Sequence, residues 1–216
     1  MKVKVCGMAY TENMKQVAAL LPDYLGFIFW EPSKRYVAEP LPTLPETIKK
    51  VGVFVDALPE AIIAKVLEFD LDLVQLHGAE SPEYCASLKM ALQEKQIQLI
   101  KVFSIREAFD FDSLKDYEGH CDYFLFDTKG ELPGGNGFAF DWGVLEAYNS
   151  NTPFFLSGGI GPEDLDKVQA FLETLAAQKC HAIDVNSKFE LEAGRKNPEA
   201  LERFLSTLKK NTKNSL

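Results

Sequence analysis

The chain has 216 residues, of which 46% are hydrophobic and 25% are charged, and this mixture excludes a disordered chain and a fibrous repeat. It carries 23 Lys and Arg against 32 Asp and Glu, a net charge of −9, which argues against nucleic acid and anionic membranes as partners. The four cysteines are scattered without metal-binding spacing, and no signal peptide or membrane span is recognisable. We therefore expect a cytoplasmic protein with reduced thiols and no cysteine-based metal site.

Eight short apolar runs alternate with amphipathic segments along the chain. The runs are rich in Val, Ile, Leu and Phe, as parallel strands covered by helices are. The predicted strands are 2–6, 24–29, 50–55, 71–76, 99–103, 122–126, 153–156 and 181–185. The predicted helices are 11–21, 59–69, 82–92, 162–176 and 198–208. The connection at 39–49 contains three prolines and predicts only a short helix, and the segment after Phe103 is ambiguous.

Strands that alternate with helices indicate a parallel sheet, either an open doubly wound sheet or a closed (β/α)8 barrel. Dividing 216 residues among eight strands leaves about 27 for each strand–helix unit. The glycine-rich turn follows the seventh strand, at Gly158 and Gly159, whereas a doubly wound sheet has its glycine fingerprint after the first. We therefore predict a single (β/α)8 TIM barrel domain over residues 1–216, with function at the C-terminal ends of its strands.

Two residues at such strand ends have acid–base chemistry. Cys6 ends the first strand on the same face as Lys4, and it points into the barrel if Val3 and Val5 pack on the helices. As a base it needs help in losing its proton, and the alternative is a small buried hydrophobe. Asp127 ends the sixth strand on the face of Leu125; it is a candidate acid or the cap of the following turn.

A phosphate site is predicted after the seventh and eighth strands. Gly158 and Gly159 let backbone N–H groups approach a phosphate, next to the start of the helix at Pro162. Asn186 and Ser187 would add amide and hydroxyl donors. The glycine-rich segment 129–137 is typical of a mobile active-site loop, although its glycines could simply make turns.

Two further side chains reach the same end of the barrel. Arg35, after the second strand, could bind a carboxylate with two parallel hydrogen bonds, or could be an ordinary surface residue. His77, after the fourth strand, is a site residue or a packed, hydrogen-bonded one. His120 and His181 begin strands and would lie at the opposite end.

These stretches together resemble the phosphoribosylanthranilate isomerase family of tryptophan biosynthesis, in family order and over nearly the whole chain. The most specific matches are KVCG at 4–7 and FDT at 126–128 with the GGNG loop at 134–137. Further matches are GFIF at 26–29, SKRYV at 33–37, VGVFV at 51–55, VQLHG at 74–78, LSGGIGPED at 156–164 and AIDVNSKFE at 182–190.

The resemblance implies an Amadori rearrangement of N-(5-phosphoribosyl)anthranilate without a metal or cofactor, in a monomer or homodimer. It implies that Cys6 is the general base and Asp127 the general acid. It also implies that Arg35 binds the anthranilate carboxylate and that Asp184 supports the substrate. The phosphate would be held by Gly158, Gly159, Asn186 and Ser187.

The chain departs from the family pattern at three places. Asn186-Ser187-Lys188 replaces Ser-Ser-Gly, Met8-Ala9 replaces Ile-Thr, and Asn136 replaces a Thr. Because Lys188 replaces a glycine, the resemblance does not fix which backbone groups contact the phosphate, and the lysine could itself bind it. Two alternatives remain. One is the related histidine-pathway isomerase, which has Asp where this chain has Cys6. The other is a non-catalytic barrel that binds a phosphorylated metabolite or a protein partner.

Overall fold

The eight predicted strands form one closed barrel. A computed structural model describes residues 1–105, 108–128 and 141–213. All eight strands run parallel, each paired with its neighbours in chain order, and β1 also pairs with β8 to close the ring. Their bounds are β1 Lys2–Val5, β2 Tyr24–Ile28, β3 Lys49–Phe54, β4 Leu73–Leu76, β5 Gln98–Ile105, β6 Tyr123–Thr128, β7 Phe154–Leu156 and β8 Cys180–Val185. The predicted TIM barrel is confirmed.

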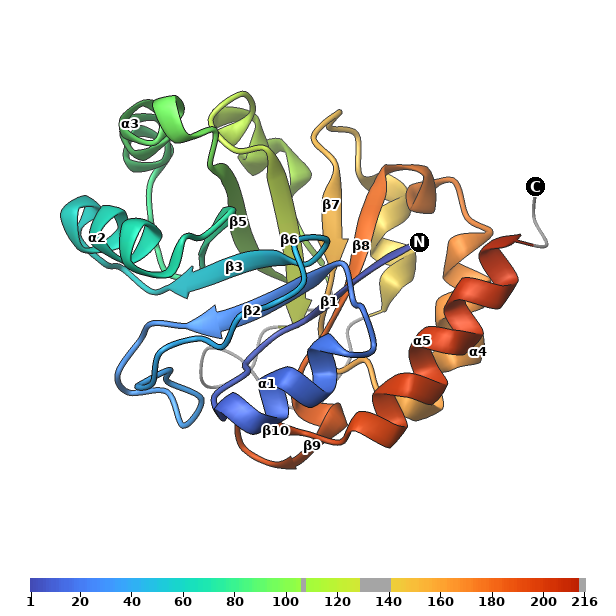
Figure 1. The fold of residues 1–216 in the computed structure, drawn as a ribbon. Helices are drawn as coiled ribbons and strands as arrows, with labels where there is room; N and C mark the ends of the chain where they lie inside the picture. The colour runs from blue at the N-terminus through green and yellow to red at the C-terminus, as the bar shows by residue number, and fades with distance from the viewer. Residues whose placement is uncertain (106–107, 129–140, 214–216) are drawn as a thin grey trace.

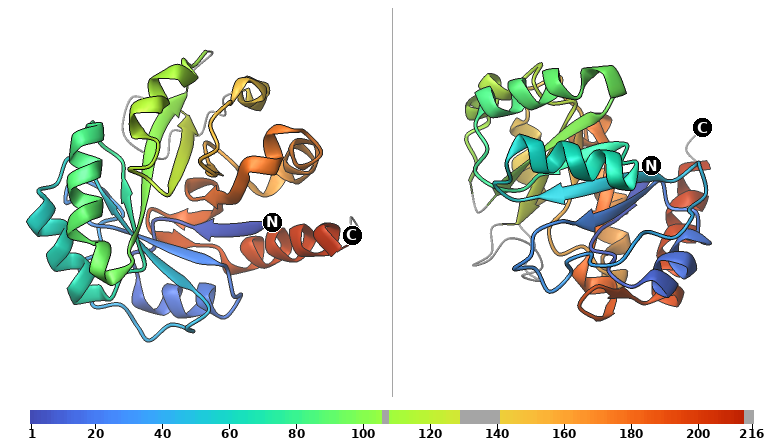
Figure 2. Two further views of the ribbon diagram at one scale, coloured as in Figure 1. Left: turned by 90° about the horizontal axis from the view of Figure 1, so that it is seen from above. Right: turned by 60° about the vertical axis from the view of Figure 1, so that its left-hand side comes forward.

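Helices surround the strands, with α2 and α3 on one side and α1, α4 and α5 on the other (Figure 1). Seen from above, the strands occupy the centre of the molecule (Figure 2). The helices are α1 Thr11–Ala18, α2 Pro59–Phe69, α3 Pro82–Ala91, α4 Leu165–Leu172 and α5 Pro198–Lys213. Short 3-10 helices are η1 Gln93–Lys95, η2 Phe111–Tyr117, η3 Trp142–Ala147, η4 Pro162–Asp164, η5 Ala176–Lys179 and η6 Ser187–Phe189. A two-stranded hairpin, β9 Glu190–Glu192 and β10 Arg195–Lys196, follows β8. Within the described ranges no helix is long and apolar enough to cross a membrane.

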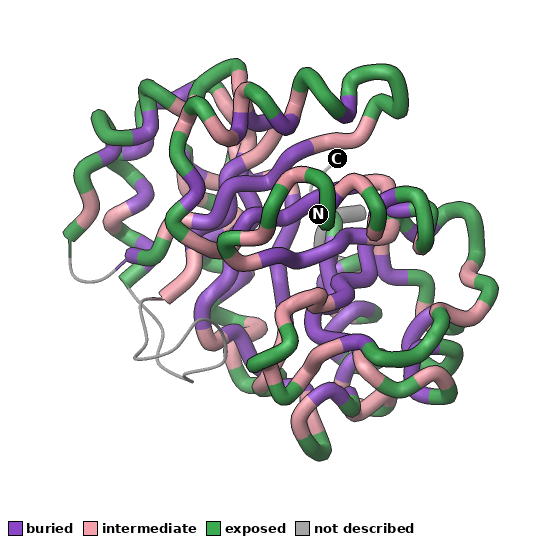
Figure 3. The backbone as a smooth tube through the Cα atoms, turned by 90° about the vertical axis from the view of Figure 1, so that its left-hand side faces the viewer, coloured by how far each residue is buried: buried purple, intermediate pink, exposed green. Residues whose placement is uncertain are grey.

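Side chains that alternate along the strands separate two layers of core. One small cluster fills the barrel and includes Val51 of β3, Ile100 of β5 and Leu125 of β6. A larger cluster lies between strands and helices and includes Val3 and Val5 of β1. The strands are correspondingly the most continuously buried part of the backbone trace (Figure 3). The predicted inward orientation of Leu125 and outward orientation of Val3 and Val5 are therefore correct.

The chain between β2 and β3 contains no helix, so the short helix expected at 39–49 is wrong. Pro40, Pro42 and Pro45 lie in this segment. Each lacks a backbone N–H and disfavours helical geometry at the residue before it, so the spacing leaves no room for a helical turn. The segment crosses the outside of the barrel in extended form instead (Figure 1).

Other boundaries differ by a few residues. The first helix ends at Ala18 rather than Leu21, since Leu21 adopts a left-handed backbone conformation at φ 52°. β6 continues to Thr128, so Asp127 belongs to the strand and keeps its alternation. The ambiguous segment after Phe103 continues β5 to Ile105, and η2 lies farther along the connection to β6.

Candidate functional site

The C-terminal ends of the strands, hereafter the mouth, bring together most of the residues predicted from sequence. Cys6 follows β1, His77 follows β4, Asp127 lies near the end of β6 and Asp184 near the end of β8. His77 Nε2 lies 3.7 Å from Asp127 Oδ2 across the barrel interior. His181 instead bonds the Tyr24 hydroxyl at 2.7 Å near the N-terminal ends of β8 and β2, as expected. The glycine-rich loop at 129–137 lies outside the described residues.

Cys6 points into the barrel because its two strand neighbours, Val3 and Val5, pack outward. Its backbone N–H donates to the Val185 carbonyl at 2.9 Å, which continues the β1–β8 pairing to the rim. The opposing residue on β2 is Gly26, where an added β-carbon would lie 2.7 Å from the Cys6 sulfur. Glycine at this position therefore makes room for the thiol. Burial raises the pKa of the Cys6 thiol, since the thiolate loses its hydration, while the positive charge of Lys4 lowers it.

Lys4 and Asp184 form a buried ion pair directly below Cys6. The two residues are register partners across β1 and β8, and Lys4 Nζ donates to Asp184 Oδ1 at 2.9 Å. Lys4 is fully buried and the Asp184 side chain is 6% exposed. Burial alone would lower the pKa of Lys4, but Asp184 and Cys6 together raise it, so the ammonium stays charged.

Asp127 has the electrostatics of a carboxylic acid that can hold its proton near neutral pH. Burial raises its pKa to about 6, and the negative charge of Asp184 acts in the same direction. The Thr128 backbone N–H donates to Asp127 Oδ1 at 2.9 Å, which fixes the carboxyl group at the rim. Burial lowers the pKa of His77 to about 4, so this imidazole is neutral at pH 7 and forms no ion pair with Asp127.

Arg35 is held by a network that the β9–β10 hairpin supplies. Its Nε and Nη2 donate to the two carboxylate oxygens of Glu190 at 2.8 and 2.7 Å. Lys196 Nζ donates to Glu190 Oε1 and to Asn186 Oδ1, both at 2.6 Å. Gly7 allows this close packing at φ +73°, because an added β-carbon would meet Asn186 at 2.6 Å and Arg35 at 2.8 Å. Glu190 and Lys196 thus connect two residues that the sequence analysis treated separately.

Gly158 and Gly159 follow β7 in left-handed backbone conformations, at φ +97° and +70°. A β-carbon on Gly158 would lie 2.3 Å from Thr128 Oγ1, so the turn packs tightly on the end of β6. The N-terminus of η4 is partly occupied, because the Gly161 N–H donates to Asp164 Oδ2 at 2.7 Å. Ser187 begins η6, and the next residue connects this element to η4, since Lys188 Nζ lies 3.9 Å from Glu163 Oε1.

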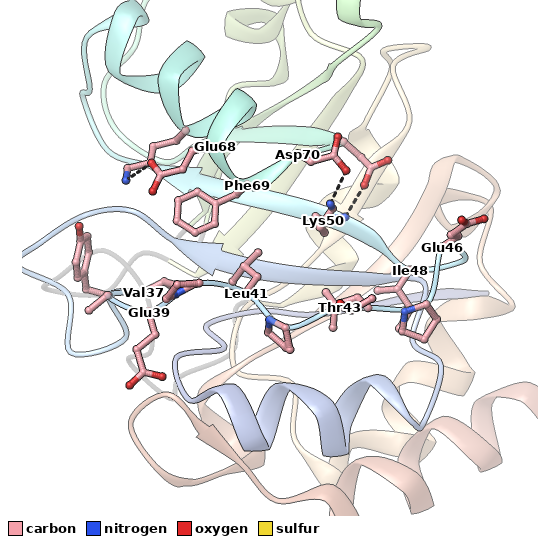
Figure 4. Close-up of a pocket in the computed structure, with 18 residues that line it drawn as sticks. Val37, Glu39, Leu41, Thr43, Glu46, Ile48, Lys50, Glu68, Phe69 and Asp70 are labelled. Carbon is pink, nitrogen blue, oxygen red and sulfur yellow. Dashed lines mark hydrogen bonds and ion pairs between the residues drawn. The ribbon is translucent and has the colours of Figure 1, made fainter.

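A large pocket of about 780 Å³ lies elsewhere, on the outside of the barrel, and we call it the wall groove. It lies between the extended segment 36–48 and the C-terminal part of α2 (Figure 4). Two ion pairs join residues of its lining: Lys50 Nζ donates to Asp70 at 2.7 Å and Lys65 Nζ to Glu68 at 2.8 Å. Lys50 and Asp72 lie at the N-terminal ends of β3 and β4, whereas Tyr36 and Val37 pair with Ile28 at the C-terminal end of β2. The wall groove therefore runs along the outside of the barrel, and its ion pairs lie toward the end opposite the mouth.

Sequence reasoning missed the buried charges that support the site residues. The strand alternation places Lys4 on the face of Cys6 but assigns it no role. Glu190 and Lys196 lie in a polar stretch after β8 that carries no local signal of burial. In the described part of the chain, no group of three His, Cys, Asp or Glu side chains is placed to hold a metal ion.

Comparison with known proteins is consistent with this geometry. Residues 3–207 match the family model described as N-(5'phosphoribosyl)anthranilate (PRA) isomerase. The N-(5'-phosphoribosyl)anthranilate isomerase of Parabacteroides distasonis is 44% identical, over 96% of this chain and 93% of its own. The phosphoribosyl anthranilate isomerase of Thermus thermophilus superposes with a TM-score of 0.80 at 28% identity, covering 97% of this chain and 99% of that one. A second solved structure, a phosphoribosyl anthranilate isomerase in complex with reduced 1-(o-carboxyphenylamino)-1-deoxyribulose 5-phosphate, has a TM-score of 0.76 at 27% identity, covering 97% of this chain and 98% of its own.

Proposed function

This chain belongs to the N-(5'-phosphoribosyl)anthranilate isomerase family, and we propose that Cys6 and Asp127 carry out its isomerisation as general base and general acid. The observation that carries the assignment is that the two groups lie at one mouth with different charged neighbours. Burial raises the pKa of both. The Asp184 carboxylate raises the pKa of Asp127 further, whereas the buried ammonium of Lys4 opposes the effect of burial on Cys6.

The reaction needs Asp127 as the protonated acid and Cys6 as the thiolate. Asp127 donates its proton to the ring oxygen of the phosphoribosyl group, the C1–oxygen bond breaks, and the anthranilate nitrogen forms an iminium with C1. The iminium acidifies the proton on C2, and the Cys6 thiolate removes it. The resulting enolamine takes a proton at C1 and its C2 hydroxyl becomes a ketone, which gives the 1-deoxyribulose product with no net oxidation. Each positioned acid or base contributes about 10²–10⁴-fold.

The anionic ends of the substrate are assigned to the two sides of the mouth. Arg35 donates to Glu190 through Nε and Nη2, which leaves Nη1, and we assign this donor to the anthranilate carboxylate. Asn186 accepts from Lys196 through Oδ1, which leaves its amide nitrogen as the donor toward the phosphate. Gly158, Gly159 and Ser187 supply the remaining donors, and Asp184 keeps Lys4 in place below the sugar. The net charge of −9 makes this local arrangement necessary, since the substrate is itself an anion.

Two broader assignments belong to the same proposal. We propose that residues 1–216 form one domain, supported by a barrel closed between β1 and β8 and by contacts of α5 with α1 and α4. We also propose a cytoplasmic location, supported by four cysteines that are all free thiols.

The test is turnover of N-(5'-phosphoribosyl)anthranilate by the purified full-length chain, followed as loss of substrate fluorescence. We expect consumption that depends on enzyme concentration, and rescue of a tryptophan auxotroph that lacks this isomerase. A well-folded protein that binds the substrate without consuming it would instead support a non-catalytic phosphate-binding barrel.

A further inference from the structure

A general base must lose its proton before it can act, and the burial of Cys6 opposes this. Cys6 is only 4% exposed, and its sulfur lies against Gly26 on the inner face of the barrel. An ordinary thiol has a pKa of about 8.5 and is mostly protonated at neutral pH. The site therefore needs a nearby positive charge that remains charged when buried.

Lys4 meets this requirement through its place on β1. It lies two residues before Cys6, so both side chains point into the barrel. Its ammonium group is fully buried and bound to Asp184 at 2.9 Å, and its positive charge lowers the pKa of the Cys6 thiol against the effect of burial. A cation in this position compensates a thiolate that has no access to water.

We propose that Lys4 is the positioning residue that prepares Cys6 for proton abstraction, with its buried ammonium serving as counter-ion to the thiolate and Asp184 holding that ammonium in place. The inference rests on the proposed function, since it takes Cys6 as the base. It assigns to Asp184 a role in fixing Lys4 in addition to any contact with substrate.

Other charged groups also face Cys6, and their effects differ. Asp184 disfavours the thiolate, and Lys196 on β10 favours it more weakly than Lys4 does. Lys196 is already bound by Glu190 and Asn186, and burial lowers its pKa to about 8. A larger fraction of Lys196 than of Lys4 is therefore uncharged at neutral pH. The charged and titratable groups around Cys6 at the mouth are Lys4, Asp184, Lys196, Arg35, Glu190, His77 and Asp127.

The test is an NMR titration of protein labelled with ¹³C at the cysteine β-carbon, in which Cys6→Ala identifies the Cys6 signal. The β-carbon shift reports ionisation of the thiol and requires neither substrate nor access of a reagent. If the pKa of Cys6 does not depend on the charge of Lys4, the role of Lys4 is rejected, and this result does not bear on whether the protein turns over its substrate.

Two variants should move the titration in opposite directions. Lys4→Gln removes the charge while its amide can still donate to Asp184, and it should raise the apparent pKa of Cys6 by about one unit or more. Asp184→Asn removes the competing negative charge and should lower it. General disturbance of the packing would not produce shifts of opposite sign. If Lys4→Gln does not fold, Lys4→Met removes the same charge with an unbranched side chain of similar length and should raise the pKa of Cys6 in the same way.

Lys2→Gln is the matched control. Lys2 belongs to the same strand and face, but its side chain is exposed at the other end and lies over the Tyr24 ring at 5.8 Å. This variant should leave the Cys6 titration unchanged within error. An unchanged titration in Lys4→Gln, or a downward shift, would overturn the proposal, as would an upward shift in Asp184→Asn.

Discussion

The mouth and the wall groove both contain several charged residues, but the ion pairs of the two regions differ in their exposure to water. In the wall groove the ion pairs are open to water: the side chains of Lys50 and Asp70 are 21% and 96% exposed. At the mouth, Lys4 and Lys196 are fully buried and their carboxylate partners are 6% exposed. Exposed pairs contribute about 0–1 kcal/mol, whereas removing one member of a buried pair costs about 3–5 kcal/mol. The mouth thus holds its charges in fixed, water-excluded positions, as the proposed chemistry requires, whereas the wall groove does not.

The largest expected difference between the two regions is in turnover. Cys6→Ala and Asp127→Asn should each lower kcat/KM by about 10²–10⁴-fold with the fold retained, because each removes a proton-transfer group. Steady-state kinetics and far-UV circular dichroism test this together. Activity near that of the wild type in either variant would remove that residue from the mechanism.

The next largest difference is in stability. Glu190→Ala leaves Arg35 and Lys196 without their shared anion, and it should lower the free energy of unfolding by about 3–5 kcal/mol. It should also raise KM, since Arg35 loses the partner that orients it. Urea unfolding measures the first effect, and a loss below about 1 kcal/mol would mean that the network is solvated rather than buried.

A smaller effect is expected at the phosphate turn. In Gly158→Ala the new methyl group would meet Thr128 Oγ1 at 2.3 Å, so the turn must move and KM should rise roughly tenfold with less change in kcat. Gly119→Ala is the matched control: its φ is also positive, at +78°, but nothing lies within 4 Å of the added carbon. Equal effects of the two variants on KM would contradict the phosphate assignment.

The smallest effect should come from the wall groove itself. Lys50→Ala and Asp70→Ala break an exposed pair and should change stability by less than about 1 kcal/mol and kcat/KM by less than about twofold. Thermal unfolding and kinetics check both. A tenfold loss of activity would show that the wall groove communicates with the mouth.

The fold could be predicted from sequence to the extent that local patterns determine it. Apolar runs identified all eight strands, and the alternation in KVKVC placed Cys6 inside the barrel, because side-chain period and strand direction are local properties. The three prolines between β2 and β3 argue against any helix there, because each lacks a backbone N–H, so the expected short helix does not form.

The charges that support the site could not be predicted in the same way. Lys4 meets Asp184 across the closure of the barrel, 180 residues apart in sequence, and Arg35 meets Glu190 across 155 residues. No local pattern indicates that a lysine in a strand or in a polar hairpin will be fully buried. Such pairs depend on tertiary contacts, which is why the candidate acid and base were found and their supporting ions were not.

The central claim is that Asp127 acts in its protonated form while Cys6 acts as the thiolate. Above its pKa of about 6, the acid form of Asp127 falls about tenfold per pH unit. Below the raised pKa of Cys6, the thiolate grows by the same factor, so in the wild type the two changes cancel.

The most direct test is kcat/KM from about pH 7 to about pH 8.5, measured side by side for the wild type and Asp127→Asn. We expect a flat profile for the wild type. The variant, at its much lower level, should rise about tenfold per pH unit, because only the Cys6 ionisation remains. Profiles of the same shape in both proteins would contradict the assignment of acid and base.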